Sequence, residues 1–95
     1  MLIKRSYVHN DIVSIKLING DEIIAKFDEE LGDNITIHRP LALTMGPNGL
    51  GMMPWMLLGD DETVILKRDH VFAITLTKKD AADQYLQGTT GIALM

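Results

Sequence analysis

The sequence predicts a mostly β fold: a small, strongly bent, five-stranded antiparallel barrel with an extended hairpin arm and one short C-terminal helix. Three observations support this. Short segments of alternating apolar and polar residues recur along most of the chain, turns rich in Gly, Asn and Asp separate them, and helical spacing begins only after Thr77. A parallel sheet would need several crossover helices, which this pattern does not contain.

The chain length sets the expected domain organisation. The 95 residues, 46% hydrophobic and 23% charged, suit a single domain over residues 1–95 and exclude a large multidomain enzyme. We expect the barrel over about residues 11–77, the helix over about 78–87 and a tail over 88–95. The core of so short a chain is modest, so association between copies would add stability.

Charge and composition narrow the class of partner. Lys and Arg total 9 against 13 Asp and Glu, for a net charge of −4, the opposite of a domain that binds duplex DNA by neutralising phosphates. The chain has no cysteine, which excludes disulfides, thiolate zinc sites and thiol catalysis. We find neither a spanning apolar segment nor a secretory signal pattern. We therefore expect a cytoplasmic protein that contacts neither duplex DNA nor a membrane.

The first two predicted strands form a hairpin. Apolar residues alternate with polar ones over residues 13–17, and the dipeptide Asn19-Gly20 is typical of a type I′ turn. A second strand is expected over residues 22–27, with Ile24 on the outer face. The acidic run at residues 28–33 is expected to be a solvated loop, because its like charges repel one another.

The third predicted strand starts at Asn34 and alternates as far as Leu43. Pro40 cannot donate to a ladder, so an edge, a bulge or a bend is expected there, with strong curvature of the strand. Residues 46–49 indicate a turn, after which the Met-rich segment at residues 50–58 returns as the arm. A polar turn is expected at residues 59–62.

Two short β-branched runs, residues 63–67 and 71–76, complete the barrel and are joined by a tight connection at 68–70. Thr77 is expected to cap the helix and Gly88 to end it. Helical spacing predicts that Tyr85 and Leu86 face the core. The alternation of Ile92 and Leu94 in the tail could add a strand to a sheet edge.

Two segments carry a resemblance to a known family. Residues 13–37, VSIKLINGDEIIAKFDEELGDNITI, resemble the first motif of Sm and Sm-like proteins, including the bacterial Hfq branch. Residues 65–74, ILKRDHVFAI, are similar to the short second motif. The overall order, including the C-terminal DQYLQGTTGI stretch, resembles the small Sm-like proteins of marine and T4-like phages, which would place the protein in an infected host cell.

The resemblance implies an SH3-like Sm barrel whose fourth strand pairs with the fifth strand of the next subunit. It also implies a homo-oligomeric ring of about five to seven subunits and single-stranded RNA as the ligand. The positions that match the family's base-binding loops are Asn34 and Arg68, with Asp33 and Lys67 beside them. An amide offers donors and an acceptor to a base edge, and a guanidinium can stack on a base or bind phosphate.

The same residues have simpler interpretations. Asp33 and Asn34 suit ordinary turn chemistry, and Lys67 and Arg68 could be solvated charges paired with Asp69 and Glu62. The sequence also departs from the family in two places. Gly32 stands where many members carry a stacking aromatic or His, and Asp69 follows Arg68 where Gly is usual.

Candidate subunit contacts are apolar residues of the last two strands and the arm: Val64, Leu66, Phe72, Ile74 and Trp55. Trp55 lies among methionines that could re-pack around a ligand, so a ligand surface and ordinary arm packing are the alternatives.

No catalytic motif is present, so we expect no enzyme activity and no cofactor. The residues His9, His38 and His70, with Asp11 and Asp69, lack the spacing of a metal-ligand set, and no metal site is expected. The main hypothesis is an RNA-binding Sm-like ring. The alternative is a phage-type assembly or protein-interaction module that keeps the barrel without RNA.

Overall fold

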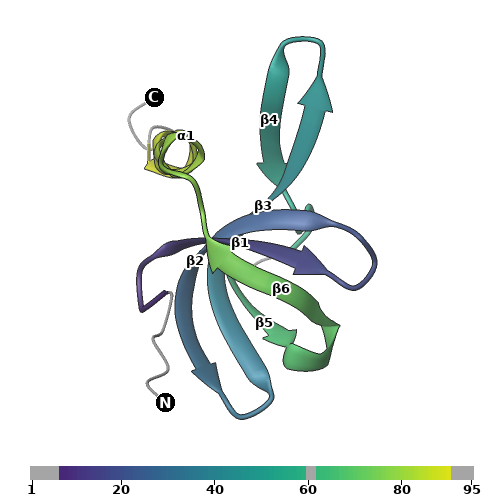
Figure 1. The fold of residues 1–95 in the computed structure, drawn as a ribbon, viewed down its shortest axis with the longest axis vertical. Helices are drawn as coiled ribbons and strands as arrows, with labels where there is room; N and C mark the ends of the chain where they lie inside the picture. The colour runs from purple at the N-terminus through teal and green to yellow at the C-terminus, as the bar shows by residue number, and fades with distance from the viewer. Residues whose placement is uncertain (1–6, 60–61, 91–95) are drawn as a thin grey trace, which may run out of the picture.

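The computed structural model describes residues 7–59 and 62–90, which form an antiparallel β structure with one C-terminal helix (Figure 1). The elements are β1 (Ile12–Leu17), β2 (Glu22–Leu31), β3 (Asn34–Gly46), β4 (Gly49–Pro54), β5 (Thr63–Lys67), the 3₁₀ turn η1 (Arg68–His70), β6 (Val71–Leu76) and α1 (Lys79–Thr90). The strand order is β4-β3-β2-β1-β6, and β5 also pairs with β3. The predicted mostly β fold with an arm and a C-terminal helix is confirmed.

The turn between β1 and β2 differs from the predicted type I′ turn. The amide of Gly20 donates to the carbonyl oxygen of Leu17 at 2.9 Å, and the amide of Leu17 donates to that of Asp21 at 2.8 Å. Gly20 has a φ of 96°, whereas Asn19 is not among the residues with positive φ. The loop is therefore a three-residue type I turn closed by one left-handed glycine, so the type I′ prediction was wrong.

Strand β2 continues to Leu31, so the prediction that residues 28–33 form a solvated loop was wrong over most of that run. Glu29 pairs with Thr36 and Glu30 with Ile35 across the β2–β3 ladder. The repulsion that argued against a strand is offset because Asp28 contacts two imidazoles and Glu30 contacts a guanidinium.

Strand β3 bends sharply at Arg39, which has a left-handed φ of 50° and precedes Pro40. The bend expected at Pro40 is thereby confirmed. On one edge of β3, residues 34–38 pair with β5 and residues 41–46 pair with β4. The bend thus separates a barrel half of β3 from an arm half, and the β3–β4 hairpin projects away from the barrel (Figure 1).

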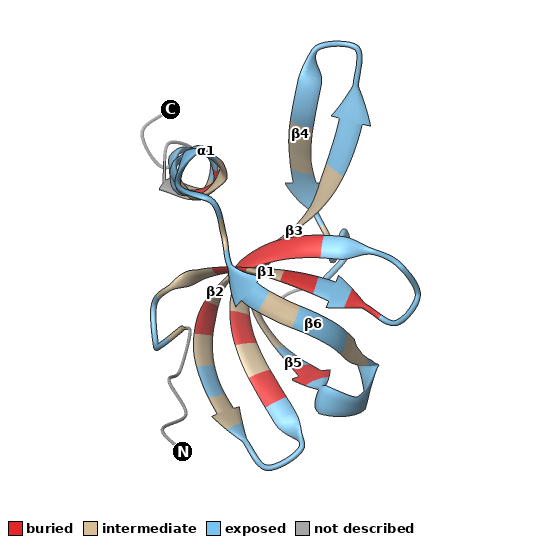
Figure 2. Cartoon of the chain, viewed as in Figure 1, coloured by how far each residue is buried: buried red, intermediate tan, exposed pale blue. Residues whose placement is uncertain are grey.

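The core lies inside the curled sheet formed by β1, β2, β3 and β5, where Figure 2 shows most of the buried residues. Its members are Val13, Ile15, Leu17, Ile23, Ala25, Phe27, Ile35, Ile37 and Leu66. Ile24 lies on the opposite face of β2 as predicted, yet it is only 1% exposed. It borders a cavity of about 690 Å³, whose walls also include Leu43 of the arm and Ala81 of α1.

Helix α1 differs from its predicted boundaries. It begins at Lys79, and the hydroxyl of Thr77 bonds to the Ser14 hydroxyl at 2.8 Å instead of capping the helix. Gly88 lies within the helix, which continues to Thr90, so the predicted end was wrong. Residues 91–95, including the alternation at Ile92 and Leu94, lie outside the described residues.

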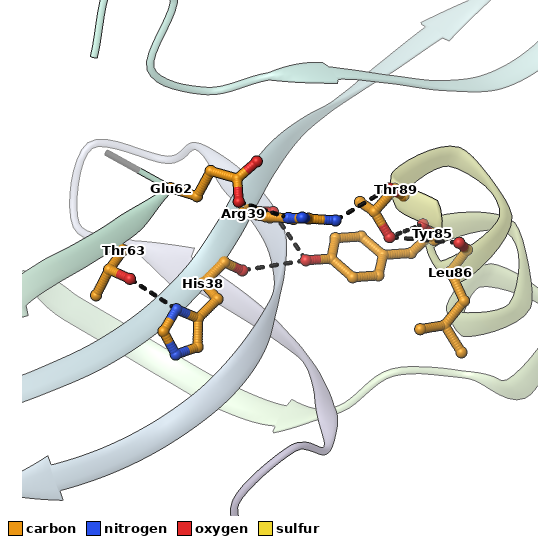
Figure 3. Close-up of polar contacts among 7 residues, drawn as sticks. All are labelled: His38, Arg39, Glu62, Thr63, Tyr85, Leu86 and Thr89. Atoms are coloured by element: carbon orange, nitrogen blue, oxygen red, sulfur yellow. Dashed lines mark hydrogen bonds and ion pairs between the residues drawn. The ribbon is translucent and has the colours of Figure 1, made fainter. Parts of the chain in front are cut away.

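The helix docks at the bend of β3 (Figure 3). The hydroxyl of Tyr85, a residue 1% exposed as predicted for a core position, donates to the carbonyl oxygens of His38 at 3.1 Å and Arg39 at 2.9 Å. The Arg39 guanidinium donates to the carbonyl oxygen of Thr89 and to the Glu62 carboxylate, both at 2.9 Å. Leu86 is 39% exposed, so its predicted core position was wrong.

Candidate nucleic-acid interface

The four residues predicted to contact RNA come together at one end of the barrel. Asn34, the first residue of β3, is the ladder partner of Lys67, the last residue of β5. The amide of Arg68 donates to the carbonyl oxygen of Asp33 at 2.8 Å. Two segments far apart in the sequence are therefore joined by main-chain pairing, and all four residues are exposed.

The turn that presents Asp33 and Asn34 is tight. Strand β2 ends at Leu31, which pairs directly with Asn34, so only Gly32 and Asp33 form the loop. Gly32 has a left-handed φ of 60°, a conformation that disfavours a side chain there. The left-handed backbone therefore favours glycine at this position of the turn, which carries no side chain that could stack on a base.

The side chain of Arg68 forms an ion pair with Glu30 of β2. The Glu30 side chain is 21% exposed and that of Arg68 is 53% exposed, so the acid is the more enclosed partner. The alternative prediction that Arg68 pairs with Glu62 does not hold, because Glu62 contacts Arg39 at 2.9 Å. The contact with Glu30 could have been predicted only by extending β2 through the acidic run.

A shallow cavity of about 310 Å³ lies beside this ion pair, lined by Asp33, Lys67, Arg68, Asp69 and His70. Two cationic side chains line it together with two carboxylates, so it is not an anion-binding pocket by charge alone. Its guanidinium, with the Asn34 amide on the adjoining strand, offers planar donor groups suited to the faces and edges of nucleobases.

Strands β5 and β6 each have one ladder partner among the described residues. Strand β5 pairs with β3 and β6 pairs with β1, so each presents one open edge. Unpaired edges are surfaces onto which another chain can add a strand. The η1 turn joins the two strands, so these two open edges belong to one β5–η1–β6 unit (Figure 1). In the part of the chain that the structure describes, strand β4 pairs only with β3 and presents a further open edge on the arm.

The candidate subunit contacts occupy different environments. Leu66 is 7% exposed inside the core of its own chain, and Val64, Ile74 and Trp55 pack against that core. Phe72 on β6 is 77% exposed. Ile65 on β5, which the sequence analysis did not select, is 63% exposed. It could have been found from the period of two, since its neighbours Val64 and Leu66 both point toward the core.

A separate polar cluster joins the N-terminal segment to the sheet. Asp28 contacts Nδ1 of His9 at 2.9 Å and Nε2 of His38 at 3.4 Å, and Nδ1 of His38 is 2.8 Å from the Thr63 hydroxyl. His70 lies instead beside the cavity described above. Over residues 7–59 and 62–90, no group of three or more His, Asp or Glu side chains is arranged to hold a metal ion.

Within the described part of the chain, no helix combines the length and the apolar character needed to cross a membrane.

The curled antiparallel sheet, the tight β2–β3 turn and the β5–η1–β6 unit define a small β-barrel of the kind that can extend its sheet through open strand edges. A family model, that of the Sm_like domain, matches residues 14–86, more than half of the chain. The chain therefore belongs to the Sm-like domain family, whose members are commonly non-enzymatic subunits of RNA-binding oligomeric rings. A search of curated proteins finds no match.

Proposed function

We propose that this protein is the subunit of a homo-oligomeric ring that binds single-stranded RNA at the Asn34–Arg68 end of the barrel. The observation that carries the proposal is the pairing of Asn34 with Lys67 and of Arg68 with Asp33, which brings an amide and a guanidinium that could contact bases to one exposed surface. Membership of the Sm-like family supports the same conclusion.

The proposed ring forms through the open edges of β5 and β6. Antiparallel pairing of β5 in one subunit with β6 in the next would complete both ladders and continue the sheet around a closed ring. Ile65 and Phe72, which are exposed in the single chain, would then lie near the junction. We propose about five to seven subunits, the number that the Sm-like family suggests, because a closed ring leaves no open β5 or β6 edge at its ends.

The RNA site gains strength from repetition. A single shallow site with an amide and a guanidinium binds weakly, but each subunit of a ring contributes one such site. Once one nucleotide is bound, the others on the same strand bind at high effective concentration.

RNA as the ligand places the proposed ring inside a cell, and an origin in a phage-infected host remains a prediction.

The test is a titration of the purified protein with a uridine-rich single-stranded RNA, alongside light scattering to measure the mass of the assembly. We expect a ring, and we expect N34A and R68A each to weaken binding about tenfold. The matched control is N48A, which removes an exposed asparagine amide from the turn of the arm and should leave affinity unchanged. Equal loss in N34A and N48A would contradict the proposed site.

A second function is favoured by one specific observation, the ion pair of Arg68 with Glu30. If that pair and the net charge of −4 exclude RNA, the same ring would serve as an assembly or protein-interaction module. A stable ring that binds no RNA at low salt would identify this second function.

A further inference from the structure

We infer that Glu30 competes with RNA phosphate for Arg68 and thereby sets both the affinity and the salt dependence of the site. This inference rests on the proposed RNA-binding function. It concerns a residue of β2 that lies outside the two segments predicted to contact RNA.

The ion pair reaches across β3. Glu30 is opposite Ile35 in the β2–β3 ladder, and Ile35 is opposite Leu66 in the β3–β5 ladder. Arg68 follows the last residue of β5, and its guanidinium contacts the Glu30 carboxylate two strands away. Because Glu30 lies on a paired strand and its side chain is only 21% exposed, the sheet holds the carboxylate beside the guanidinium.

Around the cavity beside Arg68, negatively charged side chains outnumber positively charged ones. Lys67 and Arg68 line the cavity together with the carboxylates of Asp33 and Asp69, and Glu30 adds a third carboxylate through its ion pair with Arg68. Among these Asp, Glu, Lys and Arg side chains, three carboxylates oppose two cations. A phosphate that approaches Arg68 therefore meets a guanidinium whose charge is already compensated.

The remaining attraction is for the uncharged part of a nucleotide. A guanidinium carries five N–H donors on a planar group, so an ion pair through one terminal nitrogen leaves other donors and the flat face available. The ligand best suited to the wild-type site is thus the base of a single-stranded RNA, with its phosphates held away from the acidic groups.

Glu29 provides a matched control on the same strand. It carries the same charge as Glu30 and is exposed, and it takes part in no ion pair that we find among the described residues. Both E29Q and E30Q remove one negative charge per subunit, so a difference between them does not come from net charge. The double variant with R68A tests whether it comes from the contact with Arg68.

The experiment measures the affinity of the assembled ring for a uridine-rich single-stranded RNA across about 50 to 200 mM salt. We expect E30Q to bind about fivefold more tightly than wild type at the lowest salt. The slope of log affinity against log salt should become steeper by about 0.7 for each additional phosphate that the released guanidinium binds. E29Q should stay within about twofold of wild type. In the double variant E30Q/R68A the tighter binding should vanish.

Three results would overturn the inference. An equal increase in affinity in E29Q and E30Q would indicate only a general charge effect, and weaker binding by E30Q would show that Glu30 positions Arg68 productively. In both cases RNA binding, and so the proposed function, survives. If neither wild type nor E30Q binds RNA at low salt while the ring is intact, the proposed function fails together with the inference.

Discussion

The hydroxyl of Tyr85 lies 2.9 Å from the carbonyl oxygen of Arg39, and it donates a hydrogen bond there at the one point where β3 adopts a left-handed backbone. The same hydroxyl also donates to the carbonyl oxygen of His38. A bend in a strand leaves carbonyl groups without ladder partners, and buried carbonyls without partners are costly. Tyr85 therefore joins helix α1 to the barrel by supplying a hydrogen-bond donor at the bend.

Replacing Tyr85 by Phe should lower the free energy of unfolding by about 1 to 3 kcal/mol, because the ring remains while its hydroxyl no longer pairs the two carbonyl oxygens. Urea denaturation measures this change. The control is Y7F. The ring of Tyr7 packs edge-on against that of Phe27 with 4.8 Å between the ring centroids, and we find no hydrogen bond from the Tyr7 hydroxyl in the described part of the chain. A loss in Y7F as large as that in Y85F would contradict the assigned role.

The stability of the protein should fall as pH rises from about 10 to about 12. Burial raises the pKa of Tyr85 from 10.0 to about 12, outweighing the opposing effects of the Lys26 main-chain group and the Arg39 charge. Below pH 10 both folded and unfolded states hold the proton. Above it the unfolded state loses the proton first, which removes about 2 to 3 kcal/mol by pH 12. Denaturation at several pH values should show this fall for wild type and a smaller one for Y85F.

Two glycine-to-alanine substitutions should change stability in opposite directions. Gly20 has a φ of 96°, so G20A should destabilise the protein by about 1 kcal/mol. Gly88 lies in α1 with open space around the position of a Cβ atom, so G88A should stabilise it by about 0.5 to 1 kcal/mol. Thermal unfolding of both variants checks the signs, and a stabilised G20A would rule out the left-handed turn.

Charged substitutions on the two open edges should break the ring. In I65D and F72D a carboxylate replaces a side chain that is 63% or 77% exposed in the single chain, so the fold should survive while the junction loses apolar contact and buries a charge. Light scattering should show the mass falling toward that of one chain, 10.6 kDa.

The control for these two variants is M45D, which changes a residue of the arm that is 80% exposed and lies on neither edge. Its assembly should match that of wild type. Circular dichroism confirms that each variant is folded, and folded I65D and F72D proteins with the wild-type mass would contradict the proposed junction.

Much of the fold could be predicted because period-two alternation and turn residues act locally. The strands at residues 63–67 and 71–76 match β5 and β6, and the bend at Pro40 was evident from the missing donor. The errors arise where contacts between residues far apart in the sequence determine the local structure. The acidic run joins β2, where its carboxylates contact imidazoles and a guanidinium on other segments of the chain. Thr77 bonds to Ser14, which is remote in sequence.

Some residues of the candidate site could also be predicted from the sequence, and others could not. Asp33, Asn34, Lys67 and Arg68 were selected from a resemblance, and the β3–β5 ladder brings them together. Glu30 was missed because the sequence analysis placed it in a solvated loop. Only its position in β2 brings its carboxylate to Arg68, and that contact forms between segments far apart in the sequence. Ile65 was missed although the alternation around it contained the signal.

The left-handed residue Arg39 at the middle of β3 allows the length of the β3–β4 hairpin to vary without disturbing the barrel. Each half of that strand has its own partner on the outer edge, so adding or deleting a residue pair near the tip of the hairpin alters no hydrogen bond of the barrel. The reach of the projection is therefore independent of the ring-forming body, and one scaffold can carry projections of many lengths.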